Sequence, residues 1–300
     1  MAETMNIRIL GSGSMIPTRE RAHAAVLLEH EKESMLFDCG EGTQRQLRAA
    51  GADINRISRI FITHWHGDHV LGLIGLLQTL AVQNYAGVLR IYGPRGSRRY
   101  FENMLRSIAF ALKISWELQE LESGIAAKTD LFRVECLPME HSVPCLGWAL
   151  VEEPKRKISL EAVAKFGIPK GPLLGRLQAG QPIVWKGRTV NPDDVSWLQA
   201  GKKFVYITDT IYCSNAIELA QGADLLICES THSAAIEEKA EEFMHLTARQ
   251  AAQIASQAEV KRLVLTHFSQ RYKVVDELVA EARAIFPATE AAFDLMKIKL

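Results

Sequence analysis

The chain has 300 residues, of which 48% are hydrophobic and 23% are charged, so it can bury the full core of a globular protein. Its 35 basic residues balance its 35 acidic residues, and any contact with nucleic acid therefore requires a local basic patch. Five cysteines, an odd number without a CxxC pair, argue against a disulfide framework or a thiolate metal site.

Strand and helix patterns alternate along the chain, which favours an α/β fold. Strands are expected at residues 6–10, 24–30, 34–40, 59–64, 88–94, 203–210, 223–230 and 262–268. Helices are expected at residues 42–51, 69–83, 96–112, 247–259 and 274–286. Thr247 is the expected N-cap of the fourth helix.

The N-terminal residues do not resemble a targeting peptide. MAETMNIRILGSGS has no charged leader followed by an apolar core and a small-residue cleavage site. The longest apolar stretch, residues 70–82, is interrupted by Gln78 and is too short to cross a bilayer. We therefore expect a cytoplasmic protein with no membrane partner.

Three predicted strands end in the same way. IFITH, VYITD and LVLTH are apolar runs that stop at a threonine followed by His64, Asp209 and His267, respectively. In α/β sheets the groups that perform chemistry collect beyond the carboxyl ends of strands. Chance placement would explain any one of these residues, but the set predicts that they converge on one site.

The first of these strand ends carries four potential metal ligands within six positions: His64, His66, Asp68 and His69. Zinc takes three or four nitrogen and oxygen ligands. His64 and His66 alternate in a loop and can point to the same side, so that Asp68 and His69 face a second ion.

Three distant residues complete the predicted pair of sites. Asp209 can bridge both ions, His141 in LPMEHSVPC completes the first site, and His267 completes the second. Two close metals suit an in-line displacement at phosphorus.

These motifs resemble a known family. THWHGDH with the distant residues above is similar to the metallo-β-lactamase superfamily, whose fold is a four-layer αβ/βα sandwich with a dinuclear site at the sheet edge. FDCGEGTQRQL, HGDHVLGLIGLL, GIPKGPLLGRLQAG, HLTARQAA and LTHFSQRY resemble the short form of the tRNase Z family. These segments lie between residues 37 and 272, so the resemblance extends along most of the chain.

The resemblance implies an α/β (α+β) fold in which residues 1–300 form a single metallo-β-lactamase domain. It implies a zinc-dependent endoribonuclease that removes the 3′ trailer from precursor tRNA and leaves a 3′-hydroxyl on the tRNA. We expect two Zn²⁺ per subunit, with Mn²⁺ or Fe²⁺ as alternatives for the same imidazole and oxygen ligands.

A basic segment separates His141 from Asp209. Between residues 154 and 190 it is rich in Gly and Pro and carries eight basic residues against one acid, Glu161. A charge run is often only a solvated face, but this one can neutralise phosphates without reading sequence. By resemblance, residues 152–200 are an inserted flexible arm that binds tRNA through Lys170, Gly171 and Arg176 and implies a homodimer.

Further residues are assigned roles around the expected centre. Asp68 would help to orient and deprotonate the nucleophile, and His245 would protonate the departing O3′. Glu229 is expected to keep His245 protonated, and Asp38 to orient a ligand histidine. Arg271 lies close enough to His267 in sequence to touch a phosphate.

Two alternatives remain at this stage. The chain can be a phosphodiesterase or sulfatase of the same fold that acts on small molecules, which would not need the arm. It can also be an RNA-binding module with a structural metal, although structural zinc sites are usually closed and rich in cysteine. His23, His30 and His232 are interpreted as structural or surface residues.

Overall fold

Two seven-stranded sheets form the centre of the larger of two units in this computed structural model, which describes residues 5–109 and 112–300. The first sheet contains, in spatial order, β18 (Lys297–Lys299), β1 (Asn6–Gly11), β2 (Ala25–His30), β3 (Glu33–Phe37), β4 (Ile57–Phe61), β5 (Val88–Pro94) and β6 (Ser115–Leu121). The second contains β17 (Thr289–Ala291), β16 (Leu263–Thr266), β15 (Leu225–Glu229), β14 (Lys203–Ile207), β9 (Cys145–Glu152), β8 (Phe132–Met139) and β7 (Gly124–Lys128).

Aromatic side chains pack the two sheets face to face. Phe37 of β3 meets Phe204 of β14 edge-on, with ring centroids 5.3 Å apart. Phe61 of β4 lies 5.1 Å from Trp148 of β9, measured between ring centroids. These rings are fully buried, so they form the hydrophobic layer between the sheets.

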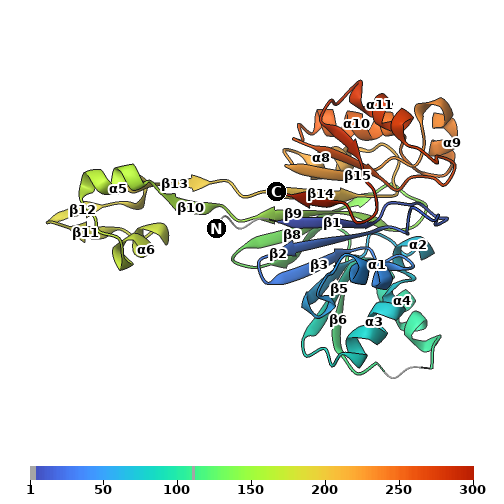
Figure 1. The fold of residues 1–300 in the computed structure, drawn as a ribbon, viewed down its shortest axis with the longest axis horizontal. Helices are drawn as coiled ribbons and strands as arrows, with labels where there is room; N and C mark the ends of the chain where they lie inside the picture. Colours follow the sequence, from blue (N-terminus) through green and yellow to red (C-terminus); the bar gives the residue numbers. More distant parts are fainter. Residues whose placement is uncertain (1–4, 110–111) are drawn as a thin grey trace. The chain divides into compact units, whose positions relative to one another are not determined.

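Helices cover the outer face of each sheet (Figure 1). The first sheet carries α1 (Thr43–Ala49), α3 (Leu73–Val82) and α4 (Ser97–Arg106), and the second carries α8 (Ser214–Ala220), α10 (Ala248–Gln257) and α11 (Asp276–Arg283). The predicted four-layer α/β sandwich is therefore confirmed, as is Thr247 as the N-cap of α10. In the described part of the chain, no helix has the length and apolarity that a membrane span requires.

One predicted helix is wrong in its continuity. Residues 69–83 were expected to form a single helix, but α2 (Gly67–Val70) ends before α3 begins. The backbone at Gly72 presses against the neighbouring loop, where a Cβ atom would lie 2.1 Å from the carbonyl oxygen of Gly40. Gly72 N also donates to Cys39 O at 2.9 Å, and this contact fixes the break.

A second predicted helix is too long. Residues 96–112 were expected to be helical, but α4 ends at Arg106. Residues 110 and 111 of this prediction lie outside the described residues. The short elements of this unit are α9 (Glu237–Glu242), η1 (Ile54–Arg56) and η2 (Ala234–Ile236).

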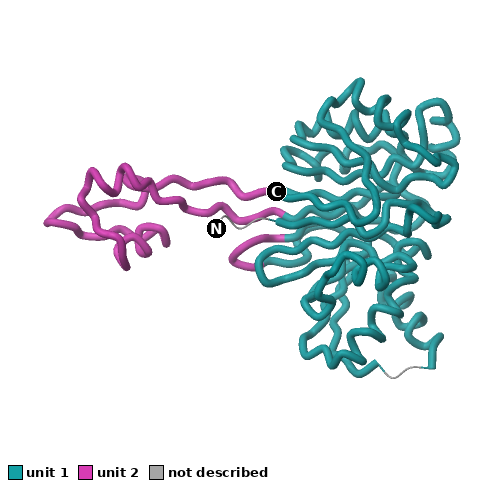
Figure 2. Tube along the Cα trace, viewed as in Figure 1, with its two compact units in different colours: residues 1–128, 134–150, 203–300 teal, residues 129–133, 151–202 magenta. Residues whose placement is uncertain are grey.

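The second unit contains residues 129–133 and 151–202 (Figure 2). In it β10 (Lys155–Ile158) pairs with β13 (Ser196–Gln199), and β11 (Ile183–Trp185) pairs with β12 (Arg188–Val190). Its helices are α5 (Leu160–Phe166), α6 (Pro172–Gln178) and α7 (Pro192–Val195). These elements enclose a small core of their own, made of Val163, Ile168, Leu177, Ile183, Val190 and Val195.

Candidate metal centre

The loop after β4 and the short helix α2 carry four of the predicted ligands. β4 ends at Phe61, and His64 and His66 follow in the loop, where they precede Asp68 and His69 of α2. His64 and His69 are fully buried, whereas His66 and Asp68 are half-buried. This turn from strand to helix places polar side chains at the end of a buried strand, where ligands of α/β proteins collect.

The other three predicted ligands follow strands of the second sheet. Asp209 comes two residues after β14, His267 directly after β16, and His141 two residues after β8. The backbone φ angles of Asp209 and His267 are +25° and +60°, a region that residues with a Cβ atom rarely adopt. Such conformations persist where the surrounding structure imposes them and cluster at functional sites.

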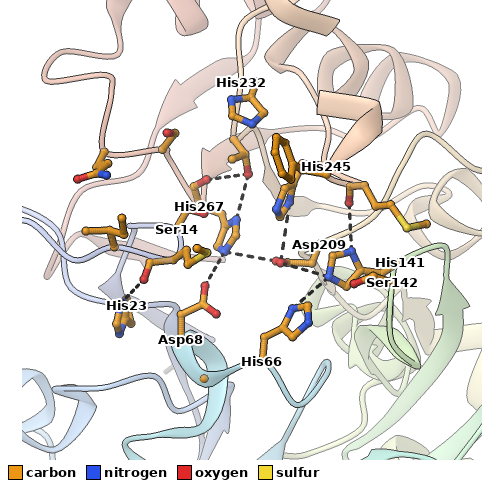
Figure 3. A pocket seen from close by; sticks show the side chains of 18 of the residues that line it. Ser14, His23, His66, Asp68, His141, Ser142, Asp209, His232, His245 and His267 are labelled. Atoms are coloured by element: carbon orange, nitrogen blue, oxygen red, sulfur yellow. Dashed lines mark hydrogen bonds and ion pairs between the residues drawn. The ribbon is translucent and has the colours of Figure 1, made fainter. Parts of the chain in front are cut away.

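The carboxylate of Asp209 lies between two sets of imidazoles. Its Oδ2 atom is 3.5 Å from His64 Nε2 and 3.8 Å from His141 Nε2. Its Oδ1 atom is 3.3 Å from His69 Nε2 and also 3.3 Å from His267 Nε2. Figure 3 shows the contact with His267. One oxygen therefore faces each set, which is the arrangement of a bridging carboxylate.

Around Asp209 the ligand atoms form two compact groups, each with all its atoms within 4.8 Å of one another. The first group is His64, His66, His141 and Asp209, and the second is Asp68, His69 and His267. A further group combines Asp209 and His267 with His245. The structure thus brings together all seven residues that the sequence predicted as ligands.

Unsatisfied polar atoms show that this donor set fits divalent cations. Within the described chain, neither His64 Nε2 nor Asp209 Oδ1 has a hydrogen-bond partner, although both are buried. His69 Nε2 and His267 Nε2 face each other at 3.2 Å. Buried groups of this kind cost free energy unless they are paired or bind a metal, and imidazole and carboxylate are ligands that zinc accepts.

Asp38 orients two of the imidazoles from behind. It accepts a hydrogen bond from His69 Nδ1 at 2.7 Å and another from Thr63 Oγ1 at 2.9 Å. Because an ionised carboxylate only accepts, Thr63 gives its single proton to Asp38, and its oxygen accepts from His64 Nδ1 at 3.1 Å. In both rings Nε2 is then the nitrogen that faces Asp209 and is available to a metal.

Glu229 makes the same pair of connections on the other side of the centre. Thr231 Oγ1 donates to Glu229 Oε2 at 2.6 Å and lies 3.1 Å from His267 Nδ1. Glu229 Oε1 is 3.2 Å from His245 Nδ1. Burial by itself lowers the pKa of His245, but the charge and hydrogen bond of Glu229, together with the charge of Asp209, outweigh it and raise this pKa to about 9.

A pocket of about 860 Å³ opens above the centre (Figure 3). Asp68, His141, Asp209, His245 and His267 line it together with the loop of residues 14–17. That loop is anchored by a residue that the sequence analysis missed. Asp294 accepts hydrogen bonds from Ser12 N and Ala22 N, at 3.0 and 2.8 Å.

Not every predicted site residue lies at this pocket. Arg271 is exposed and is not among the lining residues, although Gln270 is. Lys170, Gly171 and Arg176 are exposed residues of the second unit.

The sequence analysis also missed residues that the structure places at the site. His23 and His232, which were interpreted as structural or surface residues, line the pocket. Thr63 could have been found, because a threonine precedes the ligand at each of the three similar strand ends. No local pattern distinguishes Thr231.

Comparison with known proteins places this geometry in context. Residues 18–149 match the model of the metallo-beta-lactamase superfamily, and residues 180–268 match a beta-lactamase superfamily domain. The divalent-metal chemistry of that superfamily agrees with the His and Asp cluster described above.

Full-length relatives are also similar. A ribonuclease Z of Methanothermobacter thermautotrophicus is 39% identical over 297 residues, which cover 99% of this chain and 97% of the relative. A ribonuclease Z of Picosynechococcus sp. is 39% identical over 302 residues, covering 97% and 95%. The crystal structure of human tRNase Z, short form, aligns with a TM-score of 0.73 and 30% identity and covers 98% of both chains.

Proposed function

The chain belongs to the ribonuclease Z family of the metallo-β-lactamase superfamily, and we propose that its two groups of imidazoles hold the metals with which it removes the 3′ trailer from precursor tRNA. It is a hydrolytic endoribonuclease of tRNA 3′ processing. The observation that carries the assignment of the centre is Asp209, whose two oxygens face two separate histidine groups.

Two Zn²⁺ ions per subunit are the proposed cofactors. His64, His66 and His141 would hold one ion, and Asp68, His69 and His267 the other, with Asp209 shared between them. Bound divalent ions supply Lewis acidity to the phosphoryl oxygens and lower the pKa of water at the site. Mn²⁺ or Fe²⁺ can use the same ligands.

Two side chains are assigned to the two reacting groups: Asp68 to the attacking water and His245 to the leaving oxygen. Asp68 lines the pocket, and although burial would raise its pKa, the nearby His69 and His267 hold that pKa far below its ordinary value. It therefore stays ionised and orients the attacking water by accepting a hydrogen bond from it.

His245 is the proposed acid for the leaving group. Glu229 occupies its Nδ1 atom, so Nε2 is the nitrogen that remains to protonate O3′ as the bond between O3′ and phosphorus breaks. The tRNA then leaves with a 3′-hydroxyl, and the phosphate remains on the trailer.

The second unit is the proposed tRNA-binding arm, corresponding to the insertion of residues 152–200. Some of its charge is neutralised internally, because Lys165 pairs with Glu161 at 2.7 Å and Arg156 with Asp193 at 2.5 Å. Lys170 and Arg176 are exposed, and such side chains are suited to phosphate contacts. We also infer an RNA contact by Arg271, a homodimer and a cytoplasmic location.

An end-labelled precursor tRNA tests the function directly. Purified protein with Zn²⁺ should cut it once, after the discriminator nucleotide, and leave a 3′-hydroxyl. Cleavage of small phosphodiesters or sulfate esters without cleavage of precursor tRNA would favour a small-molecule hydrolase. Binding of the RNA without cleavage would indicate an RNA-binding module.

A further inference from the structure

The rim of the pocket is unusually apolar for a site that handles a polyanion. Met15, Ile16, Leu71 and Phe243 all line it, with exposed fractions of 70%, 45%, 56% and 52%. Large apolar side chains scattered singly over a surface need no explanation, whereas a group of them around one cavity marks a binding site. They come from three separate segments, the loop after β1, the residue after α2, and the residue after α9.

The charge of the pocket limits what it can take. The described residues that line the pocket include two acidic side chains, Glu41 and Glu242, and no Lys or Arg. Bound cations would therefore neutralise a phosphate at the cluster around Asp209, and we expect the next phosphates along the chain to lie outside the pocket. What accompanies the scissile phosphate into the pocket is the uncharged part of a nucleotide.

We propose that Phe243, with the apolar side chains of Met15 and Leu71 as further walls, binds an unpaired nucleobase next to the scissile phosphate. The inference rests on the proposed function and assigns a base-binding subsite to it. Phe243 is the one Phe, Tyr or Trp among the described lining residues, and it lies two residues from His245. Lys239 Nζ is 5.8 Å from the centre of its ring, which places a cation beside this aromatic side chain.

Stacking explains why such a subsite suits a processing enzyme. Every base has a π face, so an aromatic platform accepts any base and does not select a sequence. Trailers of different sequence can then be positioned in the same way. The nucleotides next to the scissile bond must be single-stranded, because a base within a duplex cannot stack on Phe243.

Two chromogenic esters separate this subsite from the chemistry. Thymidine 5′-(p-nitrophenyl phosphate) and methyl p-nitrophenyl phosphate release the same p-nitrophenolate, but only the first carries a nucleobase. The KM of the wild-type protein should be lower for the nucleoside ester. Phe243→Ala should raise that KM on the order of 5- to 100-fold, a much larger change than for the methyl ester.

Matched variants keep the result interpretable. Phe243→Trp should retain the preference for the nucleoside ester. Phe293→Ala removes an exposed phenylalanine, 62% accessible and outside this pocket, and should leave both KM values at the wild-type level.

The subsite is refuted if wild-type protein has equal KM values for the two esters, or if Phe243→Ala raises both to the same extent. Neither result touches the proposed function, because cleavage of precursor tRNA is measured separately. Failure of wild-type protein to cut precursor tRNA, with the KM preference intact, would instead overturn the function and leave the base-binding subsite in place.

Discussion

Replacing Thr63 by valine should loosen the metal group that contains His64. Thr63 is fully buried, and its hydroxyl donates to Asp38 while accepting from His64 Nδ1 and from Thr208 at 3.3 Å. Valine keeps the shape of the side chain but leaves the His64 Nδ1–H without an acceptor. A buried donor left in this way costs about 1–3 kcal/mol of the free energy of unfolding.

The effect on metal affinity follows from the same contact. Without this hydrogen bond the His64 ring is free to rotate. Ordering the ring then reduces the net free energy of metal binding. Removal of a hydrogen-bonding partner behind a metal ligand typically weakens metal affinity about 10- to 100-fold. Thr63→Ser retains the hydroxyl and should retain most of the affinity. Thr231→Val should instead loosen the group that contains His267.

The assay titrates metal-free protein with Zn²⁺ in competition with a chromogenic chelator and resolves two binding steps. Thermal unfolding with and without Zn²⁺ gives a second readout that does not depend on activity. Thr63→Val should weaken the binding step of the His64 group more than that of the His267 group. Thr231→Val should have the opposite pattern. Equal affinities of Thr63→Val and Thr63→Ser would refute the role of the hydroxyl.

Three further predictions address the centre and the arm. Asp209→Ala removes the carboxylate between both histidine groups, so metal analysis should find fewer than two ions per chain and phosphodiester cleavage should be lost; full wild-type activity with a single ion per chain would contradict the dinuclear centre. His245→Ala should lower kcat on precursor tRNA on the order of 10²- to 10⁴-fold, but cost much less on a p-nitrophenyl ester, whose leaving group departs without a proton. The metal content of His245→Ala should stay at the wild-type level, and His232→Ala serves as the control at a neighbouring histidine. Equal losses of kcat on both substrates would exclude His245 as the acid. Deleting residues 155–188 should weaken binding of precursor tRNA and flatten its salt dependence while cleavage of a small phosphodiester persists, and unchanged tRNA affinity would refute the role of the arm.

The sequence by itself predicted the fold class and the set of residues that gather at the centre. IFITH, VYITD and LVLTH each end in a ligand because apolar runs of this kind form buried strands, and Asp209 and His267 follow β14 and β16, two strands that run parallel in the same sheet. Parallel strands bring their carboxyl ends to one edge, so local pattern is enough to predict that such residues meet.

Only the tertiary structure decided how these residues face one another. The two oxygens of Asp209 point to different histidine groups because both sheets contribute to the centre, and no local pattern records that direction. In the connection from Glu229 through Thr231 to His267, the contact between Thr231 and His267 joins residues 36 positions apart. Periodicity reports which face of an element is buried, whereas hydrogen-bond partners and pocket walls depend on packing between distant segments. The break before α3 likewise depends on a distant segment, because the backbone at Gly72 lies against the backbone of Gly40.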